Sequence, residues 1–347
     1  MPTSYLDSAS DIGIQLAQIK GVHSFFFITD ENCSDICTDV ANPISNRRVY
    51  THTIKPGEAS KNISTYKRIA TDMAESHIDR TQSIVIGVGG GVVTDLAGFV
   101  AATFKRGVRF ISIPTSLMAM VDAAHGGKTG INLNEHKNFL GQFYKPEYIY
   151  ICTRFLESLP SPELQSGFAE VLKHGLALSQ DYWREVRTID PLQTPSADWL
   201  PIIRSSIELK TNIVEQDFKE SGVRKKLNFG HTVGHAIESH LLYKGVDTRH
   251  GHCVAAGMIV ESHISKQQGL ITASDFEEIE RTIFATFPKL PLSVADSDDV
   301  LRLMQYDKKN VNTSINFCLL SGIGSSVIDQ QVEKTTIEQA LGYYINS

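Results

Sequence analysis

The chain has 347 residues, of which 41% are hydrophobic and 21% are charged, a balance typical of globular proteins. A chain of this length has room for two domains with separate cores. Its formal net charge of −6 argues against a nucleic-acid partner, and no apolar run approaches the ~18 residues that a membrane-spanning helix needs.

The cysteines and the N-terminus both favour the cytoplasm. The five cysteines are scattered along the chain and include no Cys-x-x-Cys pair, so a cysteine zinc site is not expected. The N-terminus lacks the basic stretch and the apolar run of a secretory signal peptide. We therefore expect a cytoplasmic protein with reduced thiols.

The first half of the chain alternates strand-like and helix-like stretches. Buried-strand runs occupy residues 24–29, 83–88, 110–114 and 148–152, and helical stretches occupy residues 60–74 and 93–103. Alternation of this kind predicts an α/β domain with a parallel, Rossmann-like sheet between helices.

A glycine-rich turn joins the strand at 83–88 to the helix that follows it. Gly89, Gly90 and Gly91 would let the backbone approach a phosphate at the start of that helix. The common dinucleotide fingerprint fails in detail, because Val92 stands where its last glycine belongs. Two interpretations stay open: a nucleotide-phosphate turn, or a tight turn that packs the helix on the sheet.

The second half of the chain is mainly helical. Helical periodicity covers residues 162–178, 201–217, 231–242, 253–268 and 273–284, and a strand candidate follows only at 315–320. The change of pattern lies near Pro160 and Pro162. We therefore expect two domains, residues 1–157 and 158–347, the second mainly α-helical.

Histidines mark the segment from residue 228 to residue 252. His231 and His235 are four residues apart, so both imidazoles leave one face of a helix, for which Asn228 occupies the expected N-cap position. Thr232 stands where a zincin protease has its glutamate, which excludes that class. A catalytic zinc site has three protein ligands, of which His231 and His250 could supply two. The alternative interpretation is that these histidines only pack in the structure.

Six short sequence blocks, taken together, indicate the function more specifically than the histidines do. They are Asp-Ala-Ala-His-Gly-Gly-Lys-Thr-Gly-Ile-Asn at 122–132, Lys-Asn at 137–138, Phe-Ala-Glu-Val-Leu-Lys-His at 168–174, residues 224–235, His-Gly at 250–251, and Asp-Lys-Lys at 307–309. In this order they resemble the 3-dehydroquinate synthase family of sugar phosphate cyclases. The resemblance implies an NAD-binding domain at 1–157, a metal- and substrate-binding domain at 158–347, and a homodimer.

The resemblance also implies the cofactor ligands. It supplies Glu170 as the third metal ligand beside His231 and His250, a set that suits Zn²⁺ or Co²⁺. The NAD contacts that it implies are Asp30, Asn32, Glu58, Lys61, Gly89, Gly90, Gly91, Asp95, Thr115, Ser116 and Lys137.

The substrate contacts follow from the same resemblance. The residues matching the family's phosphate pocket are Lys128, Asn138, Asn228, His235 and Lys308, with Arg106 reaching in from a neighbouring subunit. Arg224 and Lys210 match positions that hold a carboxylate and the adjoining hydroxyl, and Asp122 and Lys173 match positions near the hydroxyls and the metal. His235 is a candidate proton carrier, because an unperturbed imidazole titrates near neutrality.

The implied reaction belongs to the shikimate pathway of aromatic amino acid biosynthesis. The family converts 3-deoxy-D-arabino-heptulosonate 7-phosphate to 3-dehydroquinate and phosphate. The implied steps are oxidation of an alcohol by NAD, β-elimination of phosphate, reduction and intramolecular aldol closure. The net reaction is that of a carbon–oxygen lyase.

Five positions depart from the family's usual pattern: Ala123, Ala124, His125, Thr94 and His252. The two alanines remove hydroxyl groups from the turn before Lys128. The imidazole of His252 stands close to the expected ligand His250, and we favour His250 because it holds the motif position.

Three rival functions remain. A sibling cyclase, of the valiolone or deoxy-inosose type, would share NAD, the metal and most motifs, but Arg224, Asn228 and Lys308 favour a substrate with a carboxylate. A glycerol-dehydrogenase-like, metal-dependent oxidoreductase would not need the lysine cluster. A non-catalytic homologue would have no reason to keep the ligands and lysines together.

Overall fold

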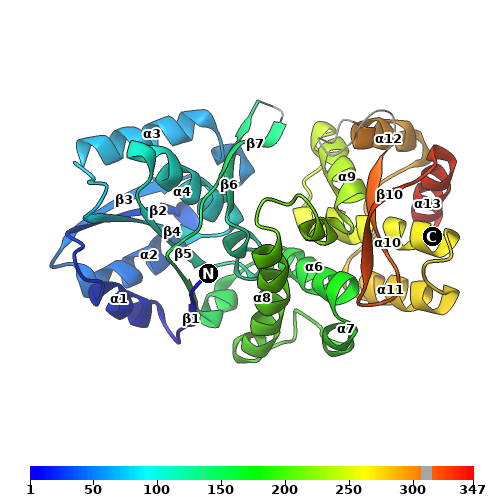
Figure 1. Cartoon of the computed structure of the whole chain (residues 1–347), viewed down its shortest axis with the longest axis horizontal. Helices are drawn as coiled ribbons and strands as arrows, with labels where there is room; N and C mark the ends of the chain where they lie inside the picture. Colours follow the sequence, from blue (N-terminus) through cyan, green and yellow to red (C-terminus); the bar gives the residue numbers. More distant parts are fainter. Residues whose placement is uncertain (135, 306–314) are drawn as a thin grey trace. The chain divides into compact units, whose positions relative to one another are not determined.

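The computed structural model describes residues 1–134, 136–305 and 315–347, which form two compact units, Met1–Leu159 and Pro160–Ser347 (Figure 1). The first unit is built on a six-stranded parallel sheet with the order β1-β8-β5-β4-β2-β3. Its strands are β1 (Thr3–Tyr5), β2 (Ser24–Asp30), β3 (Arg48–Ile54), β4 (Ser83–Gly89), β5 (Arg109–Pro114) and β8 (Tyr148–Ile151).

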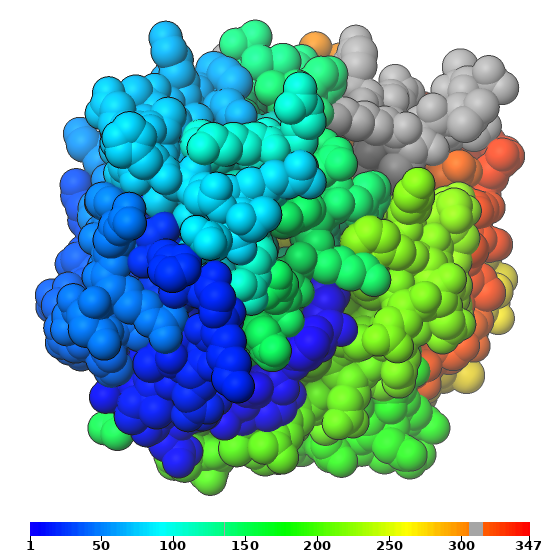
Figure 2. Space-filling view, turned by 60° about the vertical axis from the view of Figure 1, so that its left-hand side comes forward, coloured from blue at the N-terminus to red at the C-terminus, as the bar shows by residue number. Residues whose placement is uncertain are grey.

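Helices cover both faces of this sheet. The helices are α1 (Ala9–Ala17), α2 (Ser34–Ala41), α3 (Ile63–Glu75), α4 (Gly91–Thr103) and the short α5 (Leu117–Val121). Helices α3 and α4 lie on one face and α1 and α2 on the other (Figure 1). The central strands β2 and β4 are therefore buried on both faces, which is why they read as continuous apolar runs. Figure 2 shows α1 and its neighbours, in dark blue, on the surface of this unit.

A β-hairpin in the first unit was not predicted from the sequence. Strands β6 (Lys128–Leu133) and β7 (His136–Phe143) pair antiparallel, with Gly130 opposite Gly141. A Cβ on either glycine would lie 2.8 Å from a backbone oxygen of the other strand. The strand β7 is mostly exposed, so the sequence carries little of the apolar pattern that marks a strand.

In its described residues, the second unit consists of helices and a small sheet. Its helices are α6 (Ser161–Leu178), α7 (Gln180–Val186), α8 (Trp199–Gln216), α9 (His231–Tyr243), α10 (His250–Gln267), α11 (Ala273–Thr286), α12 (Ser297–Gln305) and α13 (Lys334–Asn346). Strands β9 (Asn316–Leu320) and β10 (Ser326–Gln331) form an antiparallel pair. Helix α10 packs against α6, α9, α11 and α13 and is buried along most of its length (Figure 1).

The predicted fold class is confirmed: a Rossmann-like α/β part is followed by a mainly helical part. The assignment of NAD to residues 1–157 and of metal and substrate to 158–347 stays a prediction. None of the helices in the described part of the chain is long and apolar enough to cross a membrane.

The C-terminal half of α9 is held by a buried carboxylate. Asp296 accepts a hydrogen bond from Lys244 and from the Ser293 hydroxyl, and Nε2 of His240 lies 2.8 Å from its Oδ1. The contact with Lys244 is the largest cause that holds the pKa of Asp296 well below its ordinary value of 3.8. This carboxylate therefore links α9 to the residues that precede α12.

We expect Asp296→Ala to lower the free energy of unfolding by about 1–3 kcal/mol, because His240 loses its buried partner. The folded pKa lies below the unfolded one, so the contribution is complete above about pH 4 and fades as the pH falls further. Urea unfolding of the wild type and of Asp296→Ala at about pH 3 to pH 7 measures the difference in the free energy of unfolding. Asp299→Asn, which removes an exposed ion pair with Arg302, is the control and should change little.

Candidate active site

Three helices of the second unit approach one another at glycines. A Cβ on Gly251 of α10 would lie 2.0 Å from the carbonyl oxygen of Ser166 on α6, and one on Gly257 would lie 2.0 Å from that of Gly230. No side chain fits in either space, so α10 packs backbone to backbone against α6 and against the residue before α9. These contacts fix the spacing of the three helices that carry Glu170, His231 and His250.

The carboxylate of Glu170 is fully buried and faces two imidazoles. Its Oε1 lies 3.5 Å from Nε2 of His231 and 4.0 Å from Nε2 of His250. Among the described residues, neither oxygen of Glu170 has a hydrogen-bond donor, but Oε2 forms an ion pair with the ammonium group of Lys173. Ligand atoms about 2.1 Å from a tetrahedral zinc ion are about 3.4 Å apart, so one cation fits among these three groups.

The environment of His231 favours the neutral imidazole, which is the form that binds a metal. Burial lowers its pKa well below the ordinary value of 6.5, and the charge on Lys173 lowers it further. Its Nδ1 lies 3.1 Å from the carbonyl oxygen of Phe229. If Nδ1 carries the proton and donates it there, the lone pair of Nε2 points toward Glu170.

A third imidazole completes the cluster. The ring of His235 lies 5.1 Å from that of His231 and 5.5 Å from that of His250, measured between centroids. Each of the three histidines offers a nitrogen, and these nitrogens all lie within 4.8 Å of one another. His235 is therefore close enough either to bind the same cation or to exchange a proton with a group bound to it. The expectation that His231 and His235 share one helix face is borne out.

The expected N-cap of α9 was wrong. The cap is Gly230, in a left-handed conformation with φ 78°, and Asn228 lies two residues earlier, where its amide donates to Glu220 at 2.7 Å. The acceptor for the first turn comes instead from α10: the buried carboxylate of Glu261 accepts from the backbone N–H groups of Gly230 and Val233, at 2.6 and 3.1 Å. A carboxylate is favourable there because of the helix dipole.

Two cationic side chains lie buried on elements that pack against α6. Lys210 is on α8, and Arg224 is on the 3₁₀ helix η8 (Val223–Asn228), where it donates to the carbonyl oxygen of Phe218 at 2.6 Å. The loop before η8 is held by Asp217, which accepts from the backbone N–H groups of Ser221, Gly222 and Arg224. Burial alone would raise the pKa of Asp217, but these bonds lower it to about 2.

In the first unit, several predicted NAD contacts meet at one edge of the sheet. Asp30 ends β2, Gly89 ends β4, and Thr115 and Ser116 follow β5. These three strands are neighbours, so their carboxyl ends lie side by side. The chain leaves β2 toward β3 on one side and returns to β4 on the other. Ligands of open α/β sheets bind at such a switch point, at the carboxyl ends of the strands.

The glycine turn opens directly at this point. Gly90 is the N-cap of α4 and Gly91 is its first residue, so backbone N–H groups at the start of α4 face the carboxyl edge. A Cβ on Gly89 would lie 2.6 Å from a methyl group of Val93. The close packing supports the tight-turn interpretation, and the nucleotide-phosphate interpretation stays a prediction.

A hydrogen-bond network around the buried Lys61 connects more of these residues. The ammonium group of Lys61 donates to Asp95 and to the side-chain oxygen of Asn138, both at 2.6 Å. Asn132 donates to Glu58 at 2.7 Å and accepts from the backbone of Asn138. Burial raises the pKa of Asp95, and the Lys61 charge opposes that rise.

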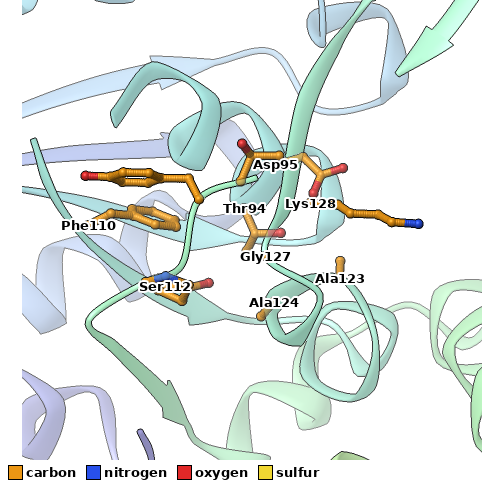
Figure 3. Close-up of a pocket in the computed structure, with 11 residues that line it drawn as sticks. Thr94, Asp95, Phe110, Ser112, Ala123, Ala124, Gly127 and Lys128 are labelled. Atoms are coloured by element: carbon orange, nitrogen blue, oxygen red, sulfur yellow. The ribbon is translucent and has the colours of Figure 1, made fainter. Parts of the chain in front are cut away.

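Three of the five family departures, Ala123, Ala124 and Thr94, line a small cavity in the first unit. Ala123 and Ala124 line it together with Asp95, Ser112 and Lys128, and Figure 3 shows the Lys128 side chain extending away from Ser112. Thr94 lines the same cavity and His125 is completely buried. The missing hydroxyls therefore change the wall of this cavity.

The remaining predicted residues lie on separate elements. Asn32 lies in the turn after β2 and Asp122 ends α5; Lys137 is exposed on β7 and Arg106 is exposed with φ 66°. Lys308 lies outside the described residues. His252 packs edge-on against Phe287, with 5.4 Å between ring centroids, so His250 and not His252 faces Glu170.

The sequence matches two family models that together cover residues 51–310. They are described as 3-dehydroquinate synthase N-terminal, over 51–166, and 3-dehydroquinate synthase C-terminal, over 167–310. The 3-dehydroquinate synthase of Parabacteroides distasonis is 37% identical over 98% of this chain and 96% of its own length. The chain belongs to the 3-dehydroquinate synthase family. The 3-dehydroquinate synthase of Leptospira interrogans is 35% identical over 98% of this chain and 94% of its own length.

Solved structures of related cyclases share the fold of this 3-dehydroquinate synthase family member. A 2-deoxy-scyllo-inosose synthase, complexed with carbaglucose-6-phosphate, NAD⁺ and Co²⁺, superposes with a TM-score of 0.86 at 22% identity, covering 98% of this chain and 95% of its own. The 2-epi-5-epi-valiolone synthase of Streptomyces hygroscopicus, with NAD⁺ and Zn²⁺ bound, also has a TM-score of 0.86, at 23% identity over 99% and 96%. The resemblance inferred from the six blocks is confirmed.

We expect Glu261→Gln to destabilise the protein by about 1–3 kcal/mol, because the new NH₂ group faces a backbone N–H that needs an acceptor. Free energies of unfolding in urea measure the loss. Glu208→Gln makes the same change on the exposed face of α8 and should leave stability unchanged. Equal stability of the two variants would show that Glu261 does not hold the start of α9.

Proposed function

We propose that this protein is a 3-dehydroquinate synthase, which converts 3-deoxy-D-arabino-heptulosonate 7-phosphate to 3-dehydroquinate and phosphate in aromatic amino acid biosynthesis. The proposed sequence is oxidation of a secondary alcohol, β-elimination of phosphate, reduction, and intramolecular aldol closure. The convergence of Glu170, His231 and His250 carries the proposal, in a chain 37% identical to such an enzyme over nearly its whole length.

The proposed cofactors are NAD and Zn²⁺ or Co²⁺. Bound NAD would accept a hydride and return it, and a bound divalent cation would polarise the oxygen at the carbon that is oxidised. Glu170, His231 and His250 would hold the cation, because a buried carboxylate oxygen without a donor faces two imidazole nitrogens. The carboxyl edge of β2, β4 and β5 would hold NAD, since the start of α4 offers N–H groups to a pyrophosphate.

His235 is the proposed proton carrier. Its ring lies beside both imidazoles that are proposed to bind the metal, and histidine changes charge near neutral pH. Lys173 forms an ion pair with Oε2 of Glu170, so it neutralises that carboxylate, and its ammonium group is proposed to lie next to the substrate hydroxyls. Asp122 is proposed to hold a substrate hydroxyl.

Cationic side chains would bind the two anionic ends of the substrate. Arg224 is suited to the carboxylate, because a guanidinium can make two parallel hydrogen bonds, and Lys210 would hold the hydroxyl beside it. The residues proposed for the phosphate are Lys128, Asn138, Asn228, His235 and Lys308, with Arg106 from a second subunit. The proposed assembly is therefore a homodimer, and the proposed compartment is the cytoplasm.

Substrate competition tests the proposed reaction. We expect purified protein with NAD and Zn²⁺ to release phosphate from the heptulosonate phosphate and to form dehydroquinate, followed by phosphate and ultraviolet assays. Sedoheptulose 7-phosphate and glucose 6-phosphate lack the carboxylate and should turn over at least 100-fold more slowly, about 3 kcal/mol for an unpaired Arg224. Preferred turnover of either would assign the protein to a sibling cyclase instead.

Metal retention tests the ligand set separately from activity. We expect Glu170→Ala to retain no stoichiometric zinc after dialysis, measured by elemental analysis, because the only carboxylate of the set is gone. His235→Gln is the matched comparison and should keep its zinc while losing most of its turnover. Zinc lost from His235→Gln but kept by Glu170→Ala would exchange their assigned roles.

A further inference from the structure

A second buried glutamate, Glu238, contacts one of the proposed metal ligands. Glu238 lies on α9 with 6% of its surface exposed, and its Oε2 is 3.1 Å from Nδ1 of His250 on α10. Glu238 follows His231 by seven residues, so it lies two turns further along the same face of α9. Helix α9 thus supplies one proposed ligand and touches the other.

The contact determines which nitrogen of His250 is available. A carboxylate only accepts, so Nδ1 of the ring must carry the proton and donate it to Glu238. The lone pair then remains on Nε2, the nitrogen that lies 4.0 Å from Oε1 of Glu170. We propose that Glu238 is a positioning residue for the metal: its hydrogen bond fixes the ring orientation and tautomer of His250.

His250 needs such a contact more than His231 does. The side chain of His250 is 34% exposed, whereas that of His231 is 12% exposed and already contacts the nearby carbonyl of Phe229. His250 is also the first residue of α10, where no preceding turn of helix packs against the ring. A charged acceptor makes a stronger hydrogen bond than a carbonyl and raises the basicity of the opposite nitrogen.

Glu238 does not take the place of a ligand. It touches Nδ1, on the opposite side of the imidazole from the nitrogen that faces Glu170. A cation held by Glu170 and by Nε2 of both histidines therefore leaves the ring of His250 between itself and Glu238. The role of Glu238 is carried out through His250.

The inference rests on the proposed metal site, so the experiment measures metal binding rather than turnover. Cobalt is titrated into metal-free wild type, Glu238→Gln and Glu238→Ala in competition with a chelator, and the visible spectrum of the bound cobalt is recorded. We expect Glu238→Ala to weaken cobalt binding about 10- to 100-fold and to change the spectrum. Glu238→Gln should be weakened less, because its amide oxygen still accepts from Nδ1.

Glu163→Gln is the matched control. Glu163 accepts from Arg249, the residue before His250, at 2.6 Å, so the variant removes a carboxylate next to the start of α10 without touching the imidazole. It should bind cobalt like the wild type. Thermal unfolding of the metal-free proteins identifies any variant that fails to fold; Glu238→Gln preserves shape and carries the test if Glu238→Ala does not fold.

The outcomes distinguish the metal site from the role of Glu238. Wild type that binds no cobalt would overturn the metal site itself, and this inference with it. Wild type that binds cobalt, together with folded Glu238 variants of unchanged affinity and spectrum, would overturn the role of Glu238 alone. Graded weakening from Glu238→Gln to Glu238→Ala, with Glu163→Gln unchanged, supports it.

Discussion

The burial of the Glu170 carboxylate is the constraint on which the second unit depends. Removing such a charge from water costs several kcal/mol unless positive charge and hydrogen bonds surround it. Lys173 meets one oxygen, and the other faces two imidazoles at distances longer than a hydrogen bond. The fold therefore places a negative charge in its interior and arranges nitrogen atoms around it, which is unfavourable in a purely structural core and favourable around a cation.

The packing of α10 is what makes this arrangement rigid. Gly251 and Gly257 let α10 contact α6 and the start of α9 through backbone atoms, which cannot shift as side chains do. The same helix carries Glu261, whose carboxylate ties down the first turn of α9. The contact between Glu238 and His250 runs in the opposite direction, from α9 to α10. Each helix thus restrains the part of the other that bears a proposed ligand.

The sequence predicted the strands and helices whose residue pattern follows from burial. Apolar runs identified β2, β4 and β5, and helical periodicity identified α6, α8, α9, α10 and α11, because burial on a sheet or on one helix face leaves a period in the chain. Contacts between distant segments left no such signal. Asn228 resembled an N-cap, yet the acceptor comes from Glu261, and Lys61 meets Asp95 and Asn138 only because three separate elements converge. Glu238 had a local signal, its spacing from His231, but that spacing acquires meaning only once α10 is known to lie beside α9.

Helical geometry also explains why the two histidine-rich segments behave differently. Residues four apart on α9 leave the helix in nearly the same direction, so His231 and His235 both reach the proposed metal site. Residues two apart on α10 leave it about 200° apart, so His250 and His252 cannot both do so. His250 faces Glu170, and His252 packs against Phe287. The departure at position 252 therefore adds no competing ligand, because the helix directs the His252 side chain away from the cluster.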